Sequence, residues 1–250
     1  MISLNDLERN FPEKVVNAIN SAVTDDIKKD ISDSNLSRPD MNSYAARIWD
    51  LINRNTDLAF KNDASVITGI TTRGPWKLRP IFDKKSGIIF TIMREERFYS
   101  VRKDPQNRKH YIGELACGLN HDLEGLQQTL LEDDTIDEKV VATIEKISKD
   151  LSLSTDMVKS HAIILFSSTE DILKSVRCIM INPMFEECVS VSWNNFIKIH
   201  DSVIVDKVSE PESKFINPSH GLSLTAKAKE RKGTRSNLSE KKSYDKAQAE

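Results

Sequence analysis

Cationic side chains interleaved with aromatic rings are the residues of this chain best suited to chemistry with a partner. Between Val66 and Gly113 there are 11 Lys/Arg against 4 Asp/Glu, and between Glu114 and Asp150 there are 3 against 10. Guanidinium and ammonium groups displace counterions from phosphates, and exposed rings stack on bases. The sequence therefore predicts binding of DNA or RNA through the 66–113 basic block. The expected contact residues are Trp76, Lys77, Arg79, Lys84, Lys85, Arg94, Arg97, Tyr99, Arg102 and Lys103, with Tyr111 as a further ring.

The same charge pattern also fits two purely structural roles, which stay open at this point. The cations can solvate the open face of an antiparallel sheet and discourage pairing of its edges, or they can pair with the acids of residues 114–150. A different function also fits, in which a protein-interaction module or inhibitor uses oppositely charged faces to bind an acidic and a basic partner. Phosphate binding predicts an affinity that falls steeply with log[salt], whereas a protein partner predicts an apolar patch inside a charged rim.

Three carboxylates allow an enzymatic alternative, a metal-dependent nuclease. Asp83, Glu95 and Glu96 have a loose likeness to the D…(D/E)-x-K pattern of restriction-type nucleases, which hold magnesium and activate water. Arg97 stands where that pattern has Lys, and Asp83 fits a turn. A nuclease requires the three carboxylates to converge in one cleft. We expect no other metal or cofactor, because the sequence has no phosphate-cradling Gly motif and its histidines lack metal-ligand spacing.

The composition is that of a soluble chain able to bury a substantial core. It has 250 residues, of which 38% are hydrophobic and 30% charged, enough for one large domain or two small ones. The longest apolar run, 162–166, is far shorter than the roughly 20 residues of a membrane span. The start of the chain lacks the pattern of a secretory signal, and three cysteines without a close pair indicate free thiols. These features predict a cytoplasmic protein with no membrane contact.

Apolar residues have helical spacing at the start of the chain. Residues 1–61 are expected to be helical, and the clearest amphipathic helix spans 40–61. A further helix is expected from Thr135, where Glu138 completes capping-box spacing. Residues 94–103 fit either a helix or a continued strand.

The spacing then changes to that of strands. Residues 76–82 alternate and predict one strand, which returns as a second strand over 88–93 after the turn 83–87. Pro80 places the first strand at a sheet edge or at a bulge.

A β-α-β-β unit is predicted in the last structured part. Its first strand is the apolar run 162–166, and Ser168 with Asp171 has the spacing that caps a short helix. Its last two strands are expected at 177–181 and 188–193.

The composition shifts again from about residue 208. The last 43 residues hold 9 Lys/Arg and 6 Asp/Glu, with few large apolar side chains after Leu224. Such a segment cannot bury enough surface to offset its ordering entropy. We therefore expect residues 208–250 to form a disordered basic tail.

Short motifs of the chain resemble a poorly characterised bacterial family of unknown function from low-GC Gram-positive bacteria and their prophages. The motifs are Arg73-Gly74-Pro75-Trp76 before the hairpin, and His110-Tyr111 leading to Leu115-Ala116. The likeness covers residues 40–200. It implies a cytoplasmic protein of unknown activity carried on a mobile element, and it assigns no catalytic residue.

These expectations describe one α+β domain over residues 1–207. Its helical part, 1–61, is expected to pack on an antiparallel sheet built within 62–207. The leading function is that of a non-enzymatic, nucleic-acid-associated accessory or regulatory protein, with phage–host conflict as its setting.

Overall fold

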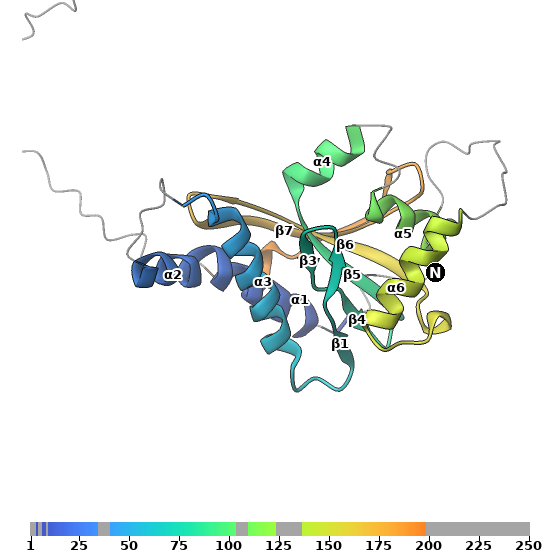
Figure 1. Ribbon diagram of the computed structural model, residues 1–250, viewed down its shortest axis with the longest axis horizontal. Helices are drawn as coiled ribbons and strands as arrows, with labels where there is room; N and C mark the ends of the chain where they lie inside the picture. Colours follow the sequence, from blue (N-terminus) through green and yellow to red (C-terminus); the bar gives the residue numbers. More distant parts are fainter. Residues whose placement is uncertain are drawn as a thin grey trace, which may run out of the picture. The chain divides into compact units, whose positions relative to one another are not determined.

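The structure, a computed structural model, describes residues 4, 7–8, 10–34, 41–103, 110–123 and 137–198 (Figure 1). The chain separates into two units, Met1–His200 and Asp201–Glu250, and all described residues lie in the first. The predicted tail, 208–250, and the predicted domain boundary near residue 207 lie outside the described residues.

Helices come first, as the apolar spacing predicts. Helix α1 (Asn10–Ser21) runs through a π-helical turn (Ala22–Asp26) into α2 (Ile27–Ser34), and α3 (Tyr44–Phe60) follows. Apolar side chains that recur every three or four positions along α1 are fully buried, because this spacing places them on one face of the helix.

Six strands form one sheet, in the order β1-β4-β5-β6-β7-β8. They are β1 (Val66–Thr68), β4 (Ile81–Asp83), β5 (Ile88–Arg94), β6 (Ser160–Thr169), β7 (Ile172–Ile181) and β8 (Glu187–Ser192). All neighbouring strands pair antiparallel except β5 and β6, which are parallel. The α+β class is confirmed, but the sheet is mixed instead of antiparallel, because a long helical connection returns the chain to the start of β5.

That connection contains α4 (Glu95–Lys103), α5 (Tyr111–Leu119) and α6 (Glu138–Asp150), and it covers the second face of the sheet. Residues 94–103 thus form a helix from Glu95 onward. Helix α6 is capped by Asp137, whose carboxylate accepts a hydrogen bond from the Lys139 amide at 3.0 Å. Thr135, the predicted cap, lies outside the described residues.

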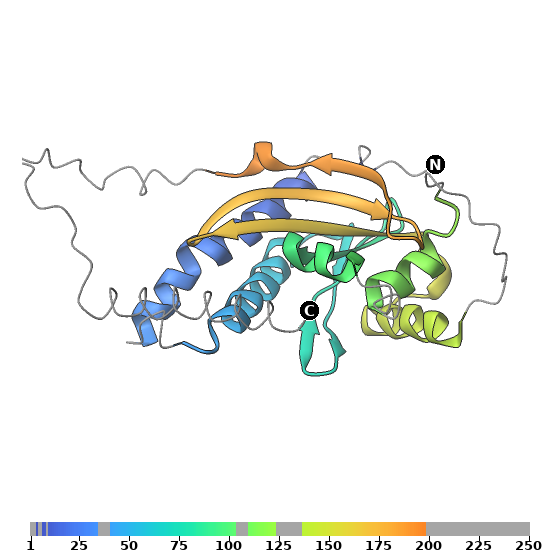
Figure 2. The same ribbon diagram turned by 90° about the horizontal axis from the view of Figure 1, so that it is seen from above.

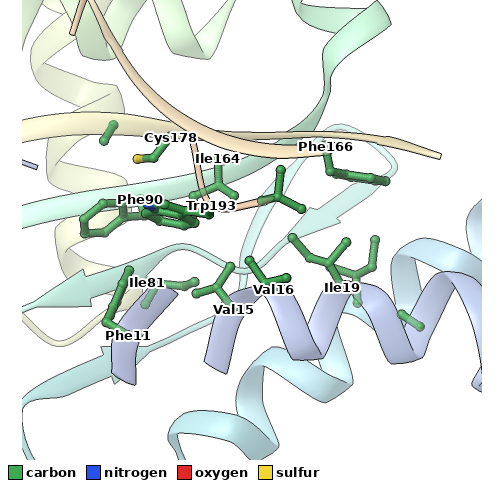
Figure 3. Packing of buried hydrophobic residues seen from close by; sticks show 14 of the residues in the cluster. Phe11, Val15, Val16, Ile19, Ile81, Phe90, Ile164, Phe166, Cys178 and Trp193 are labelled. Carbon is green, nitrogen blue, oxygen red and sulfur yellow. The ribbon is translucent and has the colours of Figure 1, made fainter. Parts of the chain in front are cut away.

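The sheet is buried on both faces. Along β6, Ala162, Ile164 and Phe166 pack in the core that holds the apolar faces of α1 and α3, which Figure 3 shows from close by. The alternate side chains, Ile163 and Leu165, pack against α4 and α5. This explains the continuous apolar run, since a strand covered on both sides has no polar face.

The strand predicted over 76–82 is two strands. Trp76–Leu78 forms β3, which pairs with β2 (Thr71–Arg73) as a separate two-stranded arm, and β4 begins only at Ile81. Pro80 has no amide hydrogen to donate to a ladder, so the pairing breaks there. The arm turns at Gly74, whose φ of +59° favours glycine. The second half of the expected hairpin, β4 with β5 and their turn, is confirmed.

The prediction of a short helix after Ser168 is wrong. Strands β6 and β7 join directly through Glu170 and Asp171, whose φ angles are 50° and 60°. Two left-handed residues in succession form the turn that matches the twist of a β-hairpin. The strand expected at 177–181 lies within β7, and the strand expected at 188–193 largely overlaps β8. The 3-10 turns η5 (Thr155–Met157) and η6 (Asn194–Phe196) complete the described elements, and no described helix is long and apolar enough to cross a membrane.

Candidate functional site

A groove of about 620 Å³ lies beside the β2–β3 arm. Figure 2 shows this arm as a teal hairpin that stands away from the sheet between α3 and α6. The groove is lined by Thr72, Arg73, Gly74, Trp76, Lys77 and Leu78 of the arm, Trp49 of α3, Ile92 and Met93 of β5, Arg97 of α4, His110 and Tyr111 at the start of α5, and Lys146 of α6. Segments far apart in the sequence therefore build one site.

Hydrogen bonds hold the arm to a helix on each side. From α3, the Asn53 side-chain amide donates to the backbone carbonyl of Lys77 at 3.3 Å. From α6, the Lys146 ammonium donates to the backbone carbonyl of Thr72. Because the two contacts reach opposite strands of the arm, they set its position between the helices.

Arg73 fixes the arm to α5 and α6 more strongly. Its guanidinium donates to the Glu114 carboxylate at 2.9 Å and to the Thr143 hydroxyl at 3.1 Å. Thr143 in turn donates to Glu114 at 2.7 Å, and the guanidinium lies 5.6 Å from the centre of the Tyr111 ring. Since the charge of Arg73 is balanced by the buried Glu114, Arg73 positions the arm and adds little free charge to the groove.

The uncompensated charge of the groove comes from Lys77, Arg97 and Lys146. All three are exposed, and no carboxylate of the described residues lies within ion-pair distance of any of them. No acidic residue is among the groove's described lining. The groove thus concentrates positive potential on one side of the domain.

Aromatic rings accompany these cations. Trp76 is 59% exposed, whereas Trp49 is half-buried and packs edge-on against Phe166 with ring centres 5.7 Å apart. The rings of His110 and Tyr111 lie 4.6 Å apart at the start of α5. Of these rings, Trp76 offers the largest open face to a ligand.

His110 and Tyr111 are both neutral in the physiological range. Burial, together with the positive charges of Arg97 and Arg73, lowers the pKa of His110 to about 4. Its Nδ1 accepts from the Ile112 amide at 3.5 Å, so the neutral ring carries its proton on Nε2. Burial raises the pKa of Tyr111 to about 12, which keeps its phenol protonated.

Of the contact residues predicted from the sequence, Trp76, Lys77 and Arg97 meet in this groove, together with Tyr111. Lys84 and Lys85 lie instead at the turn before β5, whereas Arg97 follows the end of that strand. A seven-residue strand separates the two places by about 20 Å. The basic block is therefore not one surface.

Two more predicted contacts are held by the protein itself. Arg79 forms an ion pair with Asp57 of α3, and its side chain is only 12% exposed. Arg94 donates to the Ser168 hydroxyl at 3.3 Å, and its guanidinium lies 5.3 Å from the Phe166 ring. For these residues, internal pairing is what the structure shows.

The remaining predicted contacts lie on α4 away from the groove lining. The Tyr99 hydroxyl accepts from Arg177 of β7 at 3.0 Å, and Arg102 lies 3.5 Å from Glu187 of β8. Lys103 is exposed at the end of α4. Except for Lys103, these residues join α4 to the sheet.

The carboxylates of the nuclease pattern do not converge. Asp83, before β5, accepts hydrogen bonds from the amide and hydroxyl of Ser86 at 2.9 and 2.6 Å. Glu95 and Glu96 follow the other end of β5, where Glu95 pairs with Arg177 at 2.8 Å. In the described part of the chain, no three Asp, Glu, His or Cys side chains are placed to hold a metal ion. The magnesium site that a nuclease requires is therefore not formed by these residues.

Sequence reasoning missed Lys146, Arg73, Trp49 and His110. Lys146 belongs to the acidic stretch 114–150, and only the tertiary fold brings it beside the arm. The one available signal was the Arg73-to-Trp76 motif, because a Gly-Pro pair between a cation and an aromatic ring is typical of a tight turn that presents both.

The chain belongs to a family described as "Family of unknown function (DUF5986)", whose model matches residues 4–241. This confirms the expectation of a poorly characterised family. No curated protein and no solved structure matches the chain.

Proposed function

We propose that the protein is a non-enzymatic accessory or regulatory protein that binds nucleic acid in the groove beside the β2–β3 arm. One observation carries the proposal: the exposed ring of Trp76 lies in the same groove as three cations without a carboxylate partner among the described residues, Lys77, Arg97 and Lys146. A nucleic acid supplies both groups that such a groove binds, since its phosphates carry negative charge and its bases are flat rings.

The apolar residues of the groove favour a second candidate, a protein-interaction module. Trp49, Leu78, Ile92 and Met93 line the groove together with the cations, which suits an acidic segment of a protein that inserts one apolar side chain. The identity of the cations favours nucleic acid. Lys is depleted from protein interfaces relative to the rest of the surface, and two of the three groove cations are Lys.

The salt dependence of binding tests the proposal. The full chain is titrated into a fluorescently labelled 20-nucleotide DNA or RNA of mixed sequence, from low to physiological salt, and anisotropy is measured. Neutralising three phosphates of a single strand predicts a slope of log K against log[salt] of about −2. No binding at low salt contradicts the proposal. Probes that become shorter when magnesium is added contradict its non-enzymatic part.

An acidic peptide of matched length, titrated in the same way, separates the two candidates. Nucleic acid as the ligand predicts that the oligonucleotide binds more tightly than the peptide at every salt concentration. The opposite order supports the protein partner.

A further inference from the structure

We infer that the groove binds unpaired nucleotides, with a base stacked on Trp76, so that single-stranded nucleic acid is the preferred ligand. This inference rests on the proposed function and narrows it to one class of nucleic acid. It depends on the fixed position of Trp76, on the openness of its ring, and on the size and polar groups of the groove.

Trp76 is an exposed ring on a rigid support. Its backbone pairs with Arg73 across the turn of the arm, and Arg73 is anchored to Glu114. In the described part of the chain, the indole takes part in no hydrogen bond and no ring pair. A large apolar ring that is 59% exposed, contributes little to the core and stands on an anchored backbone is suited to stacking a ligand ring, because only its own side-chain torsions have to be ordered on binding.

Base pairing decides whether a nucleic acid can use this ring. Inside a duplex both faces of a base are covered by its neighbours, so an aromatic side chain reaches a face only after the base is extruded at a cost. In a single strand the faces are open, and stacking on an aromatic side chain is available to every base. The exposed indole therefore discriminates in favour of unpaired strands.

The volume of the groove also fits a nucleotide. Sites of roughly 300–1,000 Å³ take one small molecule, and about 620 Å³ is within that range. Lys77, Arg97 and Lys146 line the groove and can neutralise phosphates, while His110 supplies a neutral N–H donor. Neutral donors match the carbonyl and ring-nitrogen acceptors at the edge of an unpaired base.

Strand preference and a Trp76 series test the inference together. Anisotropy is measured for a 12-nucleotide single strand and for the same sequence in a duplex, with the wild-type chain, Trp76→Phe and Trp76→Ala. Leu58→Ala is the matched control, because Leu58 is equally exposed at 60% and does not line the groove. Loss of one base stack predicts that Trp76→Ala weakens single-strand binding roughly 5- to 150-fold, whereas Trp76→Phe and Leu58→Ala retain most of it.

The outcomes separate the inference from the proposed function. Tighter binding of the single strand, lost in Trp76→Ala, supports both. Equal binding of single strand and duplex, unchanged in Trp76→Ala, overturns the inference and leaves the proposed function standing. No binding of either probe by the folded wild-type chain overturns the proposed function itself. Quenching of indole emission by the single strand, reduced in Trp76→Phe although that variant still binds the strand, is a second readout of stacking.

Discussion

Arg73 and Glu114 lie 41 positions apart in the sequence, and their side chains meet at 2.9 Å beside the turn of the β2–β3 arm. The contact joins the arm, which lies outside the six-stranded sheet, to α5, which packs on that sheet. Glu114 is 8% exposed, so its carboxylate depends on Arg73 and Thr143 for the hydrogen bonds that water would otherwise supply. The position of the groove therefore depends on one partly buried ion pair.

Removal of that pair should destabilise the protein measurably. We expect Arg73→Met to lower the free energy of unfolding by about 1–3 kcal/mol, because it leaves a buried carboxylate short of partners. The control is Lys85→Met, whose partner Glu8 lies at 3.6 Å with both side chains exposed; its effect should stay below about 1 kcal/mol. Urea denaturation measures both. Equal losses would show that Arg73 and Glu114 behave as a surface pair.

Buried His161 predicts acid sensitivity. Its Nε2 lies 2.9 Å from the Thr91 hydroxyl, and burial lowers its pKa to about 3. In the unfolded chain its pKa is about 6.5, so between the two values the unfolded state binds more protons and stability falls as the pH falls. His161 alone should lower the free energy of unfolding by about 2 kcal/mol from pH 7 to pH 5. The lowered pKa of His110 acts with the same sign.

Urea midpoints at pH 7, 6 and 5 check this prediction. His161→Gln should flatten the dependence on pH, although a residual slope from His110 remains. The same substitution at the exposed His121, His121→Gln, is the matched control. A wild-type stability that is constant over this range would mean that His161 is not held neutral in the fold.

The helices and most strands were predictable because apolar spacing reports which face of an element is buried. Among the mispredicted features are the helix after Ser168 and the purely antiparallel sheet. Ser168 and Asp171 have the spacing of a helix cap, but Asp also tolerates the left-handed conformation, and here Asp171 forms a two-residue hairpin turn with Glu170 while Ser168 lies in β6. The parallel pairing of β5 with β6 could not be predicted, since it depends on where the long helical connection packs.

The site was predictable only in part. A run of cations in the sequence does not distinguish the two ends of a strand, so the charge pattern assigns Lys85 and Arg97 to one surface although β5 separates them. Internal partners such as Asp57, which binds Arg79, are visible only in the fold. Lys146 reaches the groove from a segment 74 positions after Thr72, a contact that no local pattern encodes.

Charge reversal at the groove tests the central claim most directly. The variant Lys77→Glu/Arg97→Glu is compared with Lys85→Glu/Lys159→Glu, which changes the net charge equally at the other end of β5, where the Lys159 amide bonds to Gly87 at 2.8 Å. Single-strand affinity is measured at several salt concentrations. The account predicts a loss of at least about 30-fold for the groove variant and a salt slope reduced in magnitude by about 1.4, with the control near wild type. Equal losses in the two variants, or full affinity in the groove variant, would contradict it.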